Sequence, residues 1–233
     1  MKSRLLITLV IPCLLAMGCA GYNASDLGRV LDQPLDDETV AAGLREALRI
    51  GTERSTSATS AVDGFYGNPL IKVALPAQYD GAAKALRQIG LGSHVDEFEL
   101  SMNRAAEKAS GEAVSVFWDA ITGMTISDAF GILNGGETAA TDYFRRQTGD
   151  ALRARFQPIV MTKMEEVGVY RIYEDLTSYY NLLPVPKPEA VDLDEYITDR
   201  TVDGIFQVLE QEEQKIRDDP AARTTALLQK VFG

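Results

Sequence analysis

Apolar residues recur every three or four positions over most of the chain, which is the spacing of one face of an α-helix. Val40, Leu44 and Leu48 mark a first such face, and Asp36 and Asp37 before it suit a helix start. The pattern therefore predicts an all-α fold: a single multi-helix globular domain over residues 36–233. Further helical stretches are predicted at 79–89, 95–105, 114–121, 144–167, 193–216 and in the C-terminal "ALLQKVFG", whose apolar side chains we expect to dock on the domain.

Local signals predict where several helices begin and end. Ser93 with Asp96, and Thr125 with Asp128, have the spacing of capping boxes. Gly90 should stop the helix before it, and Asp219 followed by Pro220 should begin a helical turn. Pro158 should kink or break the long helix that contains it.

Two segments depart from the helical pattern. In "LIKVALP" the apolar residues alternate, so we predict one short extended segment near 70–76, without a partner strand and therefore without a sheet. The Pro-rich stretch "LLPVPKPEAV", residues 182–191, is typical of a connector. No repeat of fixed period occurs, which argues against a helical solenoid.

The N-terminus has the pattern of an export signal. Lys2 and Arg4 precede an apolar run of eleven residues, Leu5–Leu15, which is too short to cross a bilayer core. Such a segment is typical of a secretory signal peptide, which we place at residues 1–18.

The end of this signal, Leu15-Ala16-Met17-Gly18-Cys19, resembles a bacterial lipobox. The resemblance implies cleavage after Gly18, lipidation of Cys19 and a tether over residues 19–35, so that the partner is a lipid bilayer. By analogy with bacterial sorting rules, Ala20 favours an outer-membrane lipoprotein facing the periplasm. The alternative is ordinary signal cleavage, with Cys19 a coincidence.

Charge and cysteine content exclude several classes of function. The net charge is −11, from 34 acidic and 23 basic side chains, and no basic stripe interrupts it, so we expect no nucleic-acid partner. Of the two cysteines, Cys13 would be removed with the signal peptide and Cys19 would carry the lipid. Cysteine nucleophiles, cysteine-based zinc sites and redox chemistry are therefore excluded, and we expect no cofactor and no metal.

Six phrases together resemble the bacterial domain-of-unknown-function family numbered 4197. The resemblance runs in order along nearly the whole mature chain. It implies an exported, mostly helical protein of the Gram-negative envelope and supplies no catalytic residues to carry over. The phrases are "GLREALRIGTERS" (43–55), "DGFYGNPLIKVALP" (63–76), "LRQIGLG" (86–92), "ELSMNRAAEKA" (99–109), "MTISDAFGILNGGETAATDYFRRQT" (124–148) and "DPAARTTALLQKVFG" (219–233).

The phrase "ILNGGETAATDYFRR" allows two interpretations. Asn134, Gly135 and Gly136 suit a helix C-terminus in the left-handed conformation, which makes a tight corner between helices. The functional alternative is an anion site formed by the two glycines and the next helix N-terminus, with Arg145 or Arg146 assisting. Tyr143 is a further candidate ligand-binding residue. Glu137 argues against an anion there, so we favour the corner.

Asn103 and Arg104, in "SMNRAAE", are further candidate ligand groups, although a buried network that ties helices together is the favoured interpretation. If this phrase and the glycine corner met around a cavity, the preference for structural roles would reverse.

No sequence motif of a known enzyme class occurs. The G-x-S-x-G, H-E-x-x-H and Gly-Lys-Ser/Thr patterns are absent, and His94, the single histidine, suits a solvated first helical turn. The favoured function is therefore a binding or interaction module for an envelope protein or a small ligand. A tyrosine cluster supports it, provided that the rings are exposed. Its members are Tyr170, Tyr173, Tyr179 and Tyr180.

The alternative is a carboxylate-based or metal-dependent envelope hydrolase. It predicts a pocket where at least two acids converge with a histidine, an arginine or an ion. A third possibility is a structural envelope protein with one partner. The acids considered are Glu97, Glu99, Asp175, Asp192, Asp194, Glu210, Glu212 and Glu213.

Overall fold

The structure of the protein, a computed structural model, describes residues 36–184, 187 and 189–232. The predicted signal peptide and tether, residues 1–18 and 19–35, lie outside the described residues, as does Cys19. The described residues form α-helices and two short 3-10 turns, with no strand among them, and this confirms the all-α prediction.

The helices have the following bounds. They are α2 Asp37–Ser60, α3 Asp80–Gln88, α4 Gly92–Ser110, α5 Ala113–Gly123, α6 Ile126–Leu133, α7 Ala139–Val167, α8 Val169–Asn181, α9 Leu193–Asp218 and α10 Ala226–Phe232. The 3-10 turns are η1 Ala77–Tyr79 and η2 Pro220–Ala222.

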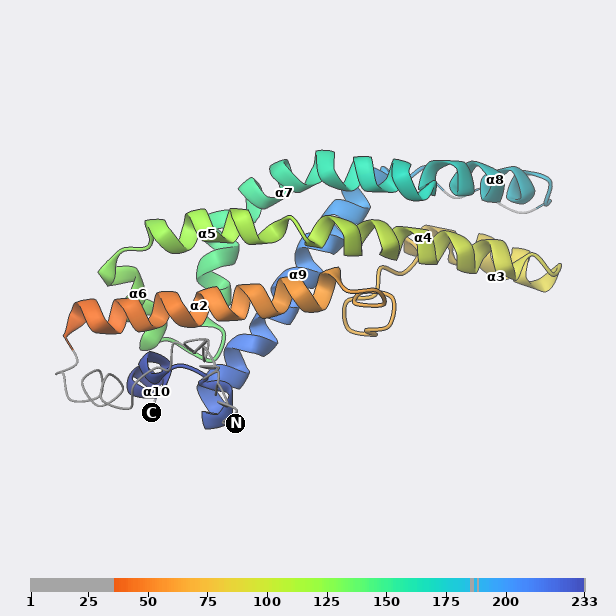
Figure 1. Cartoon of the computed structure of the whole chain (residues 1–233). Coiled ribbons are helices and arrows are strands. Elements are labelled where there is room, and N and C mark those ends of the chain that lie inside the picture. Colours follow the sequence, from red (N-terminus) through yellow and green to blue (C-terminus); the bar gives the residue numbers. More distant parts are fainter. Residues whose placement is uncertain (1–35, 185–186, 188, 233) are drawn as a thin grey trace, which may run out of the picture. The chain divides into compact units, whose positions relative to one another are not determined.

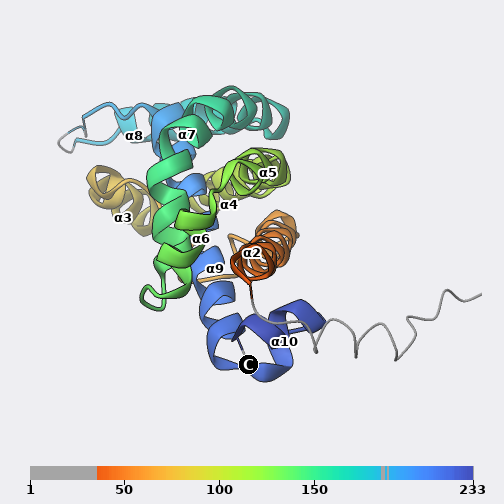
Figure 2. The ribbon, with the colours of Figure 1, turned by 90° about the vertical axis from the view of Figure 1, so that its left-hand side faces the viewer.

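The described helices are stacked in layers, and one helix crosses the layers. Figures 1 and 2 show α2, then α4 with α5, then α7 with α8 in succession. Helix α9 crosses these layers and packs against α2, α4 and α7. Helix α3 packs on α4 and α8, which together form one end of the stack.

Fully buried phenylalanines hold the middle of the stack. Phe117 of α5 makes edge-to-face ring contacts with Phe144 of α7 and with Phe206 of α9, at centroid distances of 5.6 and 5.7 Å. Each ring buries a large apolar area, and the edge-to-face geometry adds a favourable electrostatic term. These three residues join three helices that are distant in sequence.

Most predicted apolar faces are buried in this core. The predicted faces of α2, α4 and α9 are buried throughout. Ile89 and Trp118 are exceptions, because Ile89 follows the end of α3 and Trp118 points outward from α5; both are exposed.

The predicted helix starts were mostly right. Asp36 accepts a hydrogen bond from the Thr39 N–H at 2.7 Å, and Thr125 with Asp128 forms the predicted capping box. Asp219 caps η2, in which Pro220 is the first residue.

The Ser93–Asp96 capping box was wrong. Gly90 has φ of 86°, and the Leu91 N–H donates to the Leu86 carbonyl at 2.9 Å, so the chain turns directly from α3 into α4. Helix α4 therefore begins at Gly92, and Ser93 already lies inside its first turn. Asp96 instead accepts a hydrogen bond from Arg87 at 2.6 Å.

Pro158 does not break α7. The helix continues from Ala139 to Val167, although Figure 2 shows that it changes direction along its length. The proline removes one backbone donor, whereas Phe156 and Val160 on either side of it are fully buried, and this packing stabilises the helix through the proline.

The predicted extended segment is confirmed only in its second half. Residues 72–76 have neither helix nor strand structure, whereas 69–71 form a turn. Phe65, in the turns that precede this segment, is fully buried against Gly204 of α9, where a Cβ would lie 2.5 Å from the Phe65 ring. The 61–76 segment is thus packed onto the helices.

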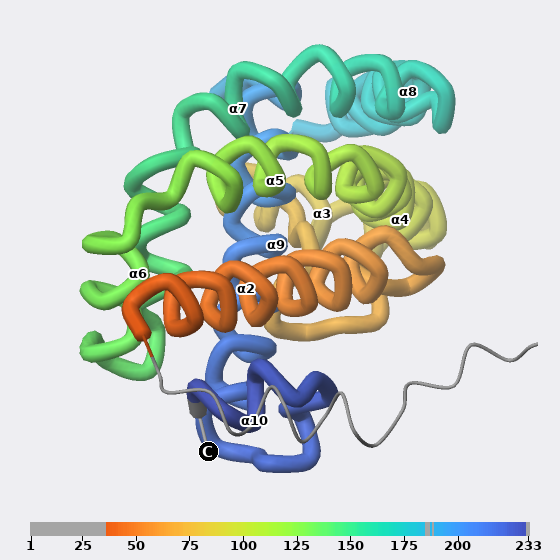
Figure 3. Tube along the Cα trace, turned by 60° about the vertical axis from the view of Figure 1, so that its left-hand side comes forward, coloured from red at the N-terminus to blue at the C-terminus, as the bar shows by residue number. Residues whose placement is uncertain are grey.

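The C-terminal helix docks on α2, as expected. Figure 3 shows α10 beside α2. Leu228 is fully buried in a small cluster with Ala47, Ile50 and Ile216, separate from the main core. Among the described residues, no single helix is long and apolar enough to span a membrane; α5 and α6 reach that length and composition only together, and they are bent by 106° at the break between them.

Candidate functional site

A pocket of about 170 Å³ opens at the end of the stack, between α3, α4 and α8. Helix α3 supplies one wall, because its buried face packs on α4 while Ala83 lies half-buried at the pocket. Lys187 and Ala190, which precede α9, also line the pocket. The lining is mainly apolar and aromatic: Leu75, Ala82, Leu86, Phe98 and Leu176, with Tyr79, Tyr173 and Tyr180, and with Thr177, Asn181 and Lys187 as the polar members.

A pair of tyrosine hydroxyls joins two of the pocket walls. The Tyr79 and Tyr173 hydroxyl oxygens are 2.7 Å apart, and the rings meet edge to face at 6.0 Å. The Tyr173 ring also lies 5.5 Å from that of Phe98. Burial, followed by the hydrogen bond to Tyr79, raises the pKa of Tyr173 to about 12.

The predicted tyrosine cluster is neither fully exposed nor fully buried. Tyr180 is buried, whereas Tyr170, Tyr173 and Tyr179 are half-buried. Tyr170 donates to Asp194 at 2.5 Å, and the Tyr179 ring lies 4.9 Å from that of His94. Tyr173 and Tyr180 are the members that line the pocket.

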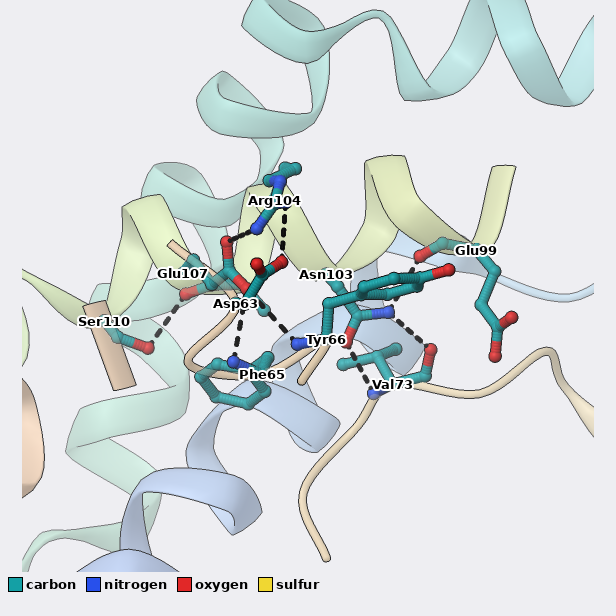
Figure 4. Close-up of polar contacts among 10 residues, drawn as sticks. Asp63, Phe65, Tyr66, Val73, Glu99, Asn103, Arg104, Glu107 and Ser110 are labelled. Carbon is teal, nitrogen blue, oxygen red and sulfur yellow. Dashed lines mark hydrogen bonds and ion pairs between the residues drawn. The ribbon is translucent and has the colours of Figure 1, made fainter. Parts of the chain in front are cut away.

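Asn103 substitutes for a partner strand. Its amide oxygen accepts from the Val73 N–H at 2.9 Å, and its amide nitrogen donates to the Val73 carbonyl and to the Glu99 carbonyl, both at 2.8 Å (Figure 4). Val73 is fully buried, so its backbone groups need partners inside the protein. The side chain therefore fixes the extended segment onto α4.

Arg104 takes part in a second, separate set of contacts. Glu107 is buried and accepts from the Phe65 and Tyr66 N–H groups, both at 3.2 Å. Arg104 donates to Glu107 at 2.6 Å and to Asp63 at 2.7 Å, as Figure 4 shows. The expected network thus exists, but it ties the 61–76 segment to α4 rather than one helix to another.

The glycine corner, which contains Asn134, Gly135 and Gly136, joins α6 to α7 without residues in the left-handed conformation. Helix α6 ends at Leu133, and Asn134 caps it with φ of −85°. Among the described residues, positive φ occurs only at Asp63, Gly90 and Gly168, so the expected left-handed conformation of Asn134–Gly136 was wrong. The corner instead requires a residue without a side chain at Gly135, because the backbone there lies close to Ala139. A Cβ on Gly135 would be 2.5 Å from the Ala139 Cβ.

The helix N-terminus at this corner already holds an anion from the chain itself. Glu213 of α9 accepts from the Ala140 N–H at 2.9 Å and from the Thr141 N–H at 2.8 Å. Arg217 donates to the same carboxylate. The backbone donors that an external anion would use are therefore occupied.

The remaining candidates near the corner also have partners. Arg145 donates to Asp203 at 2.9 Å and lies over the Phe206 ring. Tyr143 and Gly136 line an open groove of about 360 Å³ with Asp128, Asp142 and Arg146. This groove and the Asn103 and Arg104 contacts share no residue, so the two phrases do not meet at one site. Ligand binding by these residues stays a prediction.

The acids considered for metal or acid–base chemistry are mostly dispersed. Among the described residues, no group of three or more histidine, cysteine or acidic side chains is placed to hold a metal ion. One open groove between α7 and α9 gathers Asp192, Glu195 and Asp199 with Arg153, which donates to Asp199 at 2.7 Å. His94 lies elsewhere, on α4 beside Tyr179.

Several structural contacts could not be found from sequence. Glu107 and Glu213 each accept two backbone N–H groups, from residues that are 41 or more positions away. The pairing of Tyr79 with Tyr173 spans 94 positions. The one available signal was the i, i+4 spacing of Asn103 and Glu107, which puts both side chains on one face of α4.

Comparison with known proteins gives the family but no activity. No curated protein matches the chain, and no solved structure matches it. The family model described as "Protein of unknown function (DUF4197)" matches residues 34–233, which include the entire helical domain. The chain therefore belongs to the DUF4197 family.

Proposed function

We propose that this protein is a lipid-anchored envelope protein, facing the periplasm, that binds a small molecule with a ring-sized apolar group. The observation that carries the binding function is the pocket between α3, α4 and α8. Concave, mainly apolar sites with a few polar groups are the usual form of small-molecule sites.

The size of the pocket supports a ring rather than a long chain. Its volume is about 170 Å³, and an engineered apolar cavity of about 150 Å³ in another protein binds benzene. The aromatic lining of Tyr79, Phe98 and Tyr173 can also meet a ring in the edge-to-face geometry that aromatic pairs prefer. The ligand class is therefore a small aromatic compound.

The binding proposal is tested with toluene as the probe. Ligand-observed NMR and calorimetry on the purified Cys19→Ser chain should show saturable binding. In the variant Ala83→Leu the larger side chain should fill part of the pocket and weaken binding at least tenfold. The matched control is Ala42→Leu, on the exposed side of α2, which should bind like the parent chain.

Two outcomes would contradict the binding proposal. One is a lack of saturable binding by a chain that circular dichroism shows to be folded. The other is equal binding by the Ala83→Leu and Ala42→Leu variants. Native mass spectrometry of the same chain provides an independent readout, since a co-purified small molecule should add its mass to the parent chain and not to Ala83→Leu.

The anchoring proposal rests on the lipobox resemblance at Leu15–Cys19. Metabolic labelling with palmitate should mark the parent chain and not Cys19→Ser, and the labelled protein should fractionate with the outer membrane. Labelling of both chains, or of neither, would contradict lipidation at Cys19. Because a single acyl chain anchors weakly, stable membrane association requires the several chains that this modification adds.

A further inference from the structure

The hydroxyl pair of Tyr79 and Tyr173 has one hydrogen that the bond between the two hydroxyls does not use. Each phenolic hydroxyl carries one hydrogen, and the hydrogen bond between Tyr79 and Tyr173 uses only one of the two. Among the described residues, the hydrogen bonds of these two hydroxyls include no other acceptor. Whichever hydroxyl accepts within the pair therefore keeps its own hydrogen for a further partner.

Both tyrosines line the same pocket, and the walls beside them are mainly apolar. Leu75, Leu86, Phe98 and Leu176 have no polar side-chain atoms. A ligand that takes the place of water at this hydroxyl must replace the hydrogen bond to water or lose affinity.

We infer that the ligand is a small aromatic compound with an uncharged oxygen acceptor next to its ring, such as an aryl ketone, held by the Tyr79–Tyr173 hydroxyl pair. This inference rests on the proposed binding function of the pocket. An uncharged acceptor is favoured over a carboxylate because burying an ion in an apolar site is costly unless a counter-charge is buried with it. Among the described residues of the lining, Lys187 alone is charged, and it is exposed to solvent.

The test compares two probes of nearly the same shape. Acetophenone has a carbonyl where ethylbenzene has a methylene, so the change of their affinity ratio between the parent chain and a variant without the hydroxyls isolates the hydrogen bond. A net hydrogen bond of about 0.5–1.5 kcal/mol corresponds to an affinity ratio of about two- to tenfold in favour of acetophenone. Calorimetry and ligand-observed NMR on the Cys19→Ser chain would measure both affinities, with benzoate as the charged comparison.

Removal of one or both hydroxyls tests whether they supply the hydrogen bond to the ketone. The single variants Tyr79→Phe and Tyr173→Phe each keep one hydroxyl with one hydrogen, so each should still prefer acetophenone. The double variant Tyr79→Phe/Tyr173→Phe has no hydroxyl, so the carbonyl would be buried without a donor and ethylbenzene should bind more tightly than acetophenone.

The outcomes separate this inference from the proposed function. The same affinity ratio of acetophenone to ethylbenzene in the parent chain and in the double variant, with both probes weakened by Ala83→Leu, would overturn the acceptor but not the binding of a ring in the pocket. Tighter binding of benzoate than of acetophenone would overturn the uncharged class. Binding of neither neutral probe by the folded parent chain would overturn both proposals.

Discussion

At the scale of single residues, buried side chains supply hydrogen bonds that secondary structure does not. Asn103 satisfies both backbone groups of Val73, a residue without a partner strand. An amide side chain suits this task because it carries a donor and an acceptor side by side. The extended segment near 70–76 therefore needs no sheet, which explains why its alternating pattern has no partner in the sequence.

We expect Asn103→Ala to destabilise the protein by about 2–4 kcal/mol. The substitution leaves the buried Val73 N–H and carbonyl without partners, and each unsatisfied group costs about 1–3 kcal/mol. Urea unfolding followed by circular dichroism measures the change. The matched control is Asn134→Ala at an exposed helix end, where we expect a change within about 0.5 kcal/mol. Equal effects at both positions would contradict the role of Asn103.

Two buried glutamates use the same arrangement. Glu107 and Glu213 each accept two consecutive backbone N–H groups of a distant segment, and each has an arginine of its own helix as a partner, Arg104 and Arg217. Hydrogen bonds to charged groups are stronger than neutral ones, and the arginine compensates the buried charge. These carboxylates fix one segment against α4 and another against α9.

Glu213→Gln should lower the free energy of unfolding by about 2–4 kcal/mol. The neutral amide loses the ion pair with Arg217 and turns a donor toward the N–H groups at the start of α7. Chemical denaturation reports the loss, and Glu137→Gln, an exposed glutamate at the same corner, should change stability by less than about 0.5 kcal/mol. A small effect at Glu213 would show that α7 does not need this charge.

At the scale of elements, the corner between α6 and α7 depends on space rather than on backbone handedness. Gly135 lies close to Ala139, the first residue of α7, so a Cβ on Gly135 would overlap its side chain. A Cβ on Gly136 would meet open space. Neither glycine has positive φ. The two neighbours therefore offer a matched pair in which only the steric contact differs.

Gly135→Ala should destabilise the protein by about 1–3 kcal/mol, because its Cβ would overlap that of Ala139 and force α6 and α7 apart. Gly136→Ala should be neutral or stabilising by up to about 1 kcal/mol, since it only reduces the entropy of the unfolded chain. Thermal unfolding of the two variants, side by side, checks the difference. If the two midpoints coincided, close approach at Gly135 would not be what shapes the corner.

The capping box at the start of α6 should make stability depend on pH. The hydrogen bond from the Thr125 hydroxyl, and then that from its backbone N–H, lower the pKa of Asp128. A lowered folded-state pKa gives a contribution that is present above the unfolded value of about 4 and is lost as the pH falls through the folded value.

Thr125→Val should therefore cost about 1 kcal/mol at pH 6, and this difference from the parent chain should shrink toward pH 3. A remainder should persist at low pH, because the Thr125 hydroxyl also accepts from the Asp128 N–H. Urea unfolding of both chains at pH 6 and pH 3 gives the two differences. A difference that stays constant with pH would contradict the carboxylate's part in the cap.

At the scale of the whole molecule, α10 is held apart from the main core. Its Leu228 packs in the small cluster with Ala47, Ile50 and Ile216, and Val231 lies so close to Gly43 that a Cβ there would be 2.5 Å from a Val231 methyl group. A helix of seven residues is not stable alone. Its docking therefore depends on the fit to α2.

Gly43→Leu should release α10 without unfolding the other helices, because the new side chain occupies the space of Val231 and Leu227. Hydrogen exchange should show lost protection over 226–232 with little change in α9, and proteolysis near 219–225 should become faster. Ala42→Leu, one residue earlier on the exposed side of α2, should leave α10 protected. Unchanged protection in Gly43→Leu would show that α10 tolerates a shifted position.

Much of the fold could be predicted because helical signals are local. The apolar faces of α2, α4 and α9 follow from the spacing of residues within one segment, and the Thr125–Asp128 capping box needs only four consecutive residues. Ser93 failed as a cap because Gly90 and Leu91 closed the turn first. The candidate site was harder, since Tyr79, Phe98 and Tyr173 each belong to a separate stripe, and nothing local tells which stripes will share a pocket.

The sequence by itself determined the all-α class, the approximate positions of most helices, the DUF4197 membership and the lipobox resemblance, because each of these depends on neighbouring residues or on their order. Tertiary structure alone decided that Glu213 fills the helix N-terminus at the glycine corner, that Asn103 completes an unpaired segment, and that two tyrosines 94 positions apart share a hydrogen bond at a pocket. The reason is physical: a buried polar group requires a partner, but its chemistry does not specify which distant residue will supply it.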